Sequence, residues 1–169
     1  FTKLTGILPS IDIFTPNLDE AADLVSEQTT ELHSIANKFL KYLNSGSGVV
    51  LRCGPNGCFI KTNNNITLTL PAFHIDQSKV IDVTGGGNSF CGGFVTGYIL
   101  SDFNWQVGGI CGNLLSGCIV EKLGMPQVST KDGVETWNGL SLKQRIDIYI
   151  DQNPSLNIDK SQFRWVKTN

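Results

Sequence analysis

Three consecutive glycines, Gly85, Gly86 and Gly87, are the residues of this sequence best suited to chemistry. Glycine has no Cβ atom, so the backbone at these positions can adopt positive φ and approach a ligand closely. The run from Asn88 to Ser101 has helical apolar spacing, so the glycines are expected to open a helix. The N–H groups and the positive dipole end at a helix start favour an anion such as phosphate. The sequence therefore predicts an anion site at this turn.

The loop does not fit the two standard phosphate-binding motifs. A dinucleotide-binding fingerprint needs glycine where Phe90 stands, and a P-loop needs Lys followed by Ser or Thr where Gly93 and Phe94 stand. The glycines instead resemble the signature of the ribokinase-like (PfkB) sugar and nucleoside kinases, which is Asp-Thr-Thr-Gly-Ala-Gly-Asp followed by a helix of small residues. The positions that match this signature are Asp82, Thr84, Gly85 and Gly87, with mild substitutions at Val83 and Gly86.

One position departs from the signature, because Asn88 stands where the family has its catalytic aspartate. The side-chain amide of asparagine donates or accepts hydrogen bonds, but it cannot take up a proton near neutral pH. Loss of a general base slows a reaction by typically about 10²–10⁴-fold, whereas the contacts that bind a nucleotide need not change. The resemblance therefore implies a nucleotide-binding protein whose catalysis is impaired.

Two hypotheses on function remain open. In the first, the protein binds or scaffolds without catalysis. The run Gly-Gly-Gly-Asn and the segment Trp137-Asn138-Gly139 before a helix resemble a fungal branch of the family that is linked to the stability of double-stranded RNA virus particles. In the second, the protein is an active ATP-dependent sugar or nucleoside kinase with an atypical base, for which Asp82 is the candidate. Asn88 favours the first hypothesis.

The resemblance implies ATP and Mg²⁺ as cofactors, with K⁺ beside the glycine loop. Asp82 and Thr84 match positions that hold the monovalent cation in the family. Asn17 and Glu20 reproduce an Asn-x-x-Glu motif that the family associates with magnesium and phosphate. The same spacing is that of a helix capping box, so a purely structural role for this pair stays open.

Two further segments resemble the nucleotide side of the family's site. Gly54 and Gly57 occupy the glycine positions of a Thr-Leu-Gly-x-x-Gly segment that lines the ATP phosphates and ribose, with Arg52 in place of the threonine. The interval from Asn113 to Gly124 matches that between an adenine-side Asn or His and a later glycine. The structural alternative for Gly54 and Gly57 is that they only form a turn. For Asn113, it is that the polar side chain is satisfied by hydrogen bonds inside its helix.

The composition is that of a soluble globular protein. Its 169 residues carry a net charge of −2, with 17% charged and 40% hydrophobic residues, so direct nucleic-acid binding is not expected. No apolar run reaches the roughly 18 residues of a membrane span, and the five cysteines form no CxxC pair. We therefore expect free thiols, no zinc site, no membrane contact and a cytoplasmic protein.

The chain begins at Phe1 and soon enters a strand, so we expect it to be the C-terminal part of a longer protein. In the family, the N-terminal half carries a Gly-Gly-x-x-x-Asn type of motif for the sugar. The resemblance therefore implies that a sugar-like substrate would need that half, whereas a nucleotide would bind this part. A protein partner or a dimer stays open.

The order of elements predicts an α/β protein with a three-layer, ribokinase-like fold, in which a largely parallel sheet has helices on both faces and includes a β-meander. Residues 1–130 are expected to belong to the nucleotide-binding domain, and 131–169 to a helical extension packed on it. Gly93 and Gly97 are expected to let a neighbouring backbone approach closely. The expected strands are 11–14, 49–51, 58–60 and 66–70, and the expected helices start near 17 and cover 30–44, 88–101, 105–123 and 141–151.

Overall fold

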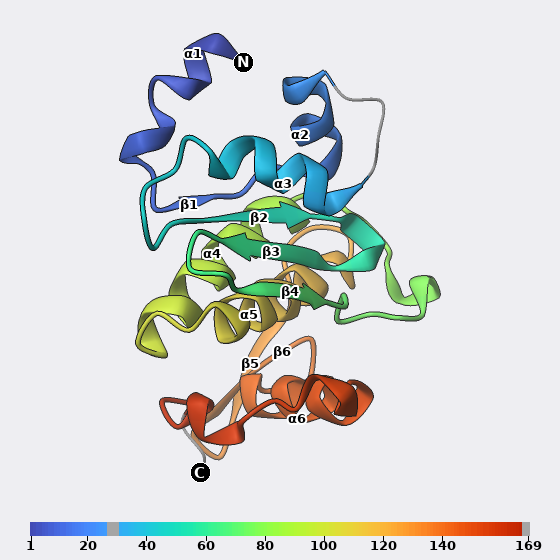
Figure 1. Cartoon of the computed structure of the whole chain (residues 1–169). Helices are drawn as coiled ribbons and strands as arrows, with labels where there is room; N and C mark the ends of the chain where they lie inside the picture. The colour runs from blue at the N-terminus through green and yellow to red at the C-terminus, as the bar shows by residue number, and fades with distance from the viewer. Residues whose placement is uncertain (27–30, 167–169) are drawn as a thin grey trace. The chain divides into compact units, whose positions relative to one another are not determined.

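The computed structural model describes residues 1–26 and 31–166. The chain divides into two compact units, Phe1–Leu70 and Pro71–Asn169. The first unit contains a four-stranded sheet with helices, and the second contains a pair of long helices, a β-hairpin and a C-terminal helix (Figure 1).

The first unit consists, in chain order, of α1 (Thr2–Thr5), β1 (Ile13–Phe14), α2 (Leu18–Val25), α3 (Leu32–Leu40), β2 (Gly48–Arg52), β3 (Cys58–Thr62) and β4 (Thr67–Leu70). The strands are arranged in the order β1-β2-β3-β4. The strands β1 and β2 run parallel, and the two following pairings are antiparallel. The last three strands form the expected β-meander, and the sheet of this unit is mixed.

The core of the first unit lies between the sheet and the helices α2 and α3. Val49 and Leu51 on β2 pack in one cluster with Ala21 from α2 and Phe39 from α3. Val50 lies between them in the strand and therefore points to the opposite face, yet it is also fully buried. Burial on both faces explains why β2 reads as an unbroken apolar run and not as an alternating one.

The second unit consists of α4 (Gly86–Leu100), α5 (Trp105–Val120), β5 (Val128–Lys131), β6 (Val134–Trp137) and α6 (Leu142–Gln152). Glycines let α4 lie directly against α5. A Cβ atom added to Gly93 would be 2.5 Å from the carbonyl oxygen of Cys111, and one added to Gly97 would be 2.6 Å from the Cβ of Cys111. The close packing that the spacing of these two glycines predicts is confirmed.

Local sequence signals define the ends of several elements in the second unit. Asn104 caps α5 with its side chain, and Ser141 forms a capping box with Gln144 at the start of α6. Asp132 and Gly133 adopt positive φ angles of 52° and 78°, which suits the two-residue turn between the antiparallel strands β5 and β6. This hairpin was not among the expected strands.

Most of the expected elements are present, with ends shifted by a few residues. The helix expected over 30–44 is α3, and residue 30 lies outside the described residues. Only one parallel strand pair occurs among the described strands, so the sheet in this chain is mixed where a largely parallel one was expected. None of the described helices is long and apolar enough to cross a bilayer.

Candidate functional site

The glycine loop forms the start of α4 and is shaped by contact with α5. Gly85 is the N-cap residue and adopts a left-handed conformation with φ of 81°. A Cβ atom at Gly86 would lie 3.0 Å from Cγ1 of Val120 and 3.3 Å from Oγ of Ser116. Gly85 therefore supplies the backbone angle that the turn needs, and Gly86 supplies the close approach to α5.

The segment before the glycines is held by hydrogen bonds from both sides. The backbone N–H groups of Ile81 and Asp82 donate to the carbonyl oxygen of Val120, at 2.8 and 3.2 Å. The carboxylate of Asp82 accepts a hydrogen bond from the backbone N–H of Thr84 at 2.9 Å. The predicted loop is therefore an ordered turn that is anchored to the end of α5.

The backbone amides at the start of α4 favour an anion, whereas the nearby carboxylate of Asp82 adds a negative charge. The N–H groups of Gly87 and Asn88 belong to the first turn of α4, whose amides have no acceptor one turn earlier in the helix. The side chain of Asn88 is exposed in the same turn. Hydrogen bonds from the backbone and the side chain of Thr84 lower the pKa of Asp82, so this carboxylate is ionised at neutral pH.

In the first unit, Asn17 and Glu20 form the capping box at the start of α2. The N–H of Asn17 donates to Oε2 of Glu20 at 2.9 Å, and the N–H of Glu20 donates to Oδ1 of Asn17 at 2.8 Å. The same oxygen of Glu20 lies 3.4 Å from Nη2 of Arg52. The capping role is thus confirmed, and a role of Asn17 and Glu20 in binding magnesium stays a prediction.

The glycine turn between β2 and β3 lies at the same edge of the sheet as this cap. Gly54 and Gly57 both adopt positive φ, at 53° and 81°, so each is required by the turn itself. A backbone bridge between Asn17 and Arg52 continues the parallel pairing of β1 and β2 up to the turn. The first unit therefore brings Asn17, Glu20, Gly54 and Gly57 to the carboxyl ends of its parallel strands, which is where α/β sheets place ligands.

Asn113 lies within the packing of the second unit. Its side chain is 4% exposed, and its Nδ2 donates to the carbonyl oxygen of Pro71 at 2.9 Å. The structural alternative expected a polar residue satisfied within its helix, whereas this hydrogen bond goes to a distant segment of the chain. A contact between Asn113 and an adenine ring stays a prediction.

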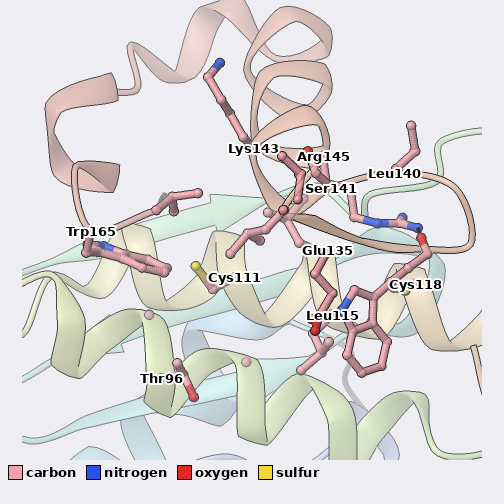
Figure 2. A pocket seen from close by; sticks show the side chains of 18 residues that line it. Thr96, Cys111, Leu115, Cys118, Glu135, Leu140, Ser141, Lys143, Arg145 and Trp165 are labelled. Atoms are coloured by element: carbon pink, nitrogen blue, oxygen red, sulfur yellow. Dashed lines mark hydrogen bonds between the residues drawn. The ribbon is translucent and has the colours of Figure 1, made fainter. Parts of the chain in front are cut away.

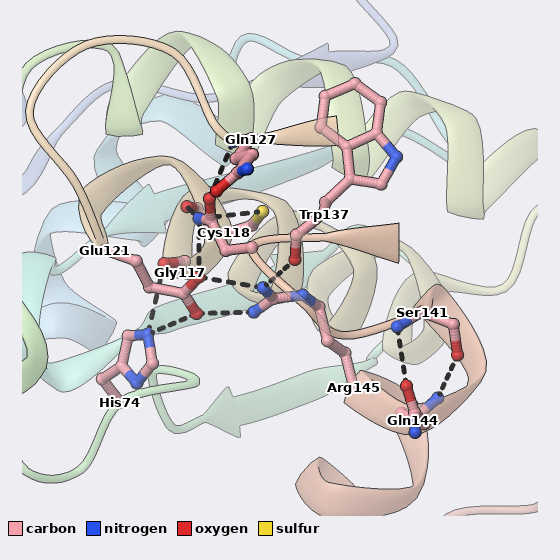
Figure 3. Close-up of polar contacts among 10 residues, drawn as sticks. His74, Gly117, Cys118, Glu121, Gln127, Trp137, Ser141, Gln144 and Arg145 are labelled. Atoms are coloured by element: carbon pink, nitrogen blue, oxygen red, sulfur yellow. Dashed lines mark hydrogen bonds and ion pairs between the residues drawn. The ribbon is translucent and has the colours of Figure 1, made fainter. Parts of the chain in front are cut away.

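A cluster of polar side chains around Glu121, which directly follows α5, was missed by the sequence analysis (Figure 3). Both carboxylate oxygens of Glu121 accept hydrogen bonds from Arg145 on α6, at 2.6 and 2.9 Å. His74 lies 3.0 Å from Oε1, and Nδ2 of Asn138 donates to Oε2 at 2.8 Å. Burial alone would raise the pKa of Glu121, but the hydrogen bonds from His74, Arg145 and Asn138 and the charge of Arg145 together lower it to about 2.

A weak sequence signal for this cluster is present on α6. Arg145 and Tyr149 are one helical turn apart, and both are buried, so the arginine lies on the apolar face of the helix. A buried arginine needs an acidic partner, and this requirement directs attention to the carboxylate of Glu121. The cluster joins α5, the turn after β6 and α6, and we interpret it as structural.

Comparison with protein-family profiles identifies the family of this chain. The sequence profile described as pfkB family carbohydrate kinase matches residues 2–128. The chain therefore belongs to the pfkB family of carbohydrate kinases.

Two fungal proteins are similar over most of this chain. Protein MAK32 of Saccharomyces cerevisiae is 36% identical over 152 residues, which cover 83% of this chain and 41% of the yeast protein. An uncharacterized protein of Schizosaccharomyces pombe is 28% identical over 178 residues, which cover 88% of this chain and 46% of that protein. The chain thus spans less than half the length of these relatives.

Solved structures of ribokinase-family enzymes share the fold. The adenosine kinase of Trypanosoma brucei brucei is 25% identical with a TM-score of 0.61, over 72% of this chain and 38% of the kinase. A ribokinase of Arabidopsis thaliana in complex with ribose and ATP is 20% identical with a TM-score of 0.61, over 71% of this chain and 38% of that chain. The predicted ribokinase-like α/β fold is confirmed.

Proposed function

We propose that this chain is the nucleotide-binding part of a pfkB family protein that binds ATP but transfers phosphate poorly. The observation that carries the proposal is the start of α4, where Gly85 opens the helix with positive φ and Asn88 is exposed in the first turn. Phosphoryl transfer asks a protein mainly for positioning and charge stabilisation, and helix-start amides supply both for a phosphate. The acceptor hydroxyl also needs a base, which the amide of Asn88 cannot be. The protein then acts by binding or as a scaffold.

Two structural neighbours support a nucleotide as the ligand. The Arabidopsis ribokinase structure contains ribose and ATP. A structure of the adenosine kinase of Anopheles gambiae, with a TM-score of 0.62, contains P1,P4-di(adenosine-5) tetraphosphate. In this chain, the amides at 85–88 would hold the phosphates. Gly54 and Gly57 of the first unit and Asn113 of the second stay proposed nucleotide-binding residues.

We propose K⁺ at Asp82 and Thr84, and Mg²⁺ together with the nucleotide. Asp82 is ionised, and Thr84 lies beside it in the glycine loop, so the pair offers oxygen ligands for K⁺. Glu20 already accepts a hydrogen bond from Asn17 and pairs with Arg52, so its carboxylate is partly neutralised. Mg²⁺ would therefore be held mainly by the nucleotide phosphates. We also propose that residues 1–130 form the nucleotide-binding part and that residues 131–169 form an extension of it.

The second candidate function is that of an active sugar or nucleoside kinase with another base. Asp82 is the carboxylate in the loop, but the hydrogen bonds that lower its pKa also make it a weak base. A sugar-like substrate would need the part of the family fold that this chain does not span. A role in the stability of double-stranded RNA virus particles stays a prediction from the fungal resemblance.

Titration of the full chain with MgATP, followed by melting temperature and calorimetry, tests the proposal. We expect saturable binding in the micromolar to millimolar range and a rise in melting temperature. Gly87→Asp adds a side chain and a negative charge where the glycine backbone is proposed to approach the phosphate. It should weaken binding by about ten-fold or more, because the side chain blocks the close approach and like charges repel. Gly92→Asp places the same charge farther along α4 and should leave the affinity unchanged. A wild-type protein that shows no shift at millimolar MgATP would contradict the proposal.

A further inference from the structure

The second unit contains a cavity of about 650 Å³ between the helix pair α4–α5 and the C-terminal segment (Figure 2). Gly93, Thr96 and Gly97 line it from α4, and Cys111 and Leu115 line it from α5. The opposite wall comes from the β5–β6 hairpin, the start of α6 and the last described residues of the chain. A volume of this size falls within the range of about 300–1,000 Å³ in which proteins bind small molecules.

Two tryptophans in the lining have their polar N–H groups turned to protein acceptors. Nε1 of Trp137 donates to Glu135 at 2.6 Å, and Nε1 of Trp165 donates to the carbonyl oxygen of Gln162 at 3.0 Å. Each N–H is therefore already used, and what remains for a ligand is the flat apolar ring. Aromatic rings pair best with other planar aromatic groups, by stacking or by edge-to-face contact.

The basic residues of the lining are already paired with acids. Arg145 is bound by Glu121, and Lys143 lies 2.5 Å from Asp147. The buried thiol of Cys111 is uncharged at neutral pH, because burial raises its pKa to about 12. The charge of Arg145 is thus countered by Glu121, and that of Lys143 by Asp147, which Lys160 also contacts at 3.8 Å. Nε of Arg145 has no hydrogen-bond partner among the described residues.

We propose that this cavity is a binding site for a neutral, planar aromatic small molecule, separate from the glycine loop. The apolar helix wall accounts for the apolar ligand, and the faces of Trp137 and Trp165 account for its planarity. The paired charges and the carboxylate of Glu135 at the lining act against an anion. The site does not depend on the nucleotide proposal, because its residues lie outside the first turn of α4.

The test uses the full chain and a neutral naphthalene dye, 6-propionyl-2-(dimethylamino)naphthalene. Its emission should rise and shift to the blue, with saturation at about one dye per chain. Thr96→Phe adds a ring to the α4 wall of the cavity, and it should weaken dye binding at least ten-fold. Val95→Phe adds the same ring at the next, exposed position, which does not line the cavity, and should leave dye affinity within two-fold of wild type.

A second variant and a second dye complete the test. Trp165→Ala removes one aromatic face and should weaken binding of the neutral dye about ten-fold, with the melting temperature recorded as a check on folding. The anionic dye 1-anilinonaphthalene-8-sulfonate should bind at least ten-fold more weakly than the neutral one. The proposal is overturned if the neutral dye does not saturate, if Thr96→Phe and Val95→Phe affect it equally, or if the anionic dye binds as tightly.

Discussion

Glu121 at the end of α5 and Arg145 on α6 form a two-pronged ion pair, with Nη1 2.6 Å from Oε1 and Nη2 2.9 Å from Oε2. Arg145 also donates to the carbonyl oxygen of Trp137 at 2.8 Å, and its guanidinium lies 5.2 Å from the ring centre of Phe73. The same turn of α5 carries Val120, whose carbonyl oxygen anchors the segment before the glycine loop. The ion pair thus links α6 to the end of α5, the helix that anchors the glycine loop.

Arg145→Met should lower the free energy of unfolding by about 3 kcal/mol, because it leaves the carboxylate of Glu121 without its charged partner in a mostly buried site. Lys143→Met is the matched control on the same helix. Its ion pair with Asp147 is largely exposed, and its loss should cost about 0.5 kcal/mol or less. Urea unfolding of the wild type and the two variants measures the difference in the free energy of unfolding. Equal losses in both variants would show that the buried ion pair contributes no more to stability than the exposed one.

Protonation of Glu121 should lower the free energy of unfolding in acid. Its pKa is lowered from 4.5 to about 2 in the folded protein, so the unfolded chain binds a proton on this group more readily. The contribution is complete above about pH 4.5 and is lost as the pH falls toward about 2. Glu121→Gln should be less stable at neutral pH and should lose less stability than wild type between these two values. Parallel pH dependences of the two proteins would assign the acid sensitivity to other carboxylates.

The glycines of α4 should differ sharply in their response to alanine. Gly93→Ala would bring a Cβ to 2.5 Å from the backbone of Cys111, so α4 and α5 must move apart, at a cost of about 1–3 kcal/mol. Gly92→Ala meets no neighbouring atom within 4 Å among the described residues outside its own helix turn, and should stabilise the protein by about 0.5–1 kcal/mol. Thermal unfolding compares the two, and a shift of the same sign in both would contradict the packing role of Gly93.

Features that depend on neighbours in the sequence were predicted well. The capping box of Asn17 and Glu20 follows from their spacing, and the helix that follows the glycine loop follows from its apolar period. The turn at Asp132 and Gly133 was open to the same reasoning, because this dipeptide is typical of two-residue hairpins.

Features that depend on partners far apart in the chain were not predicted. His74, Glu121, Asn138 and Arg145 come from four separate segments of the chain, and no short-range pattern links them. The burial of Asn113 likewise depends on the backbone at Pro71, which lies on a distant segment. Helical spacing alone places a polar residue on a helix, but it does not say what that residue faces.

Asn88→Asp, assayed for ATP hydrolysis with nucleotide affinity measured in parallel, tests the central claim most directly. The substitution returns a near-isosteric carboxylate to the first turn of α4, where the helix dipole stabilises its ionised form. The wild-type protein is expected to bind MgATP and to hydrolyse it at background rate. Asn88→Asp should bind somewhat more weakly and hydrolyse at least about 10²-fold faster, as the restored general base requires. Robust wild-type turnover that Asn88→Ala leaves unchanged would contradict this account, because the base would then lie elsewhere.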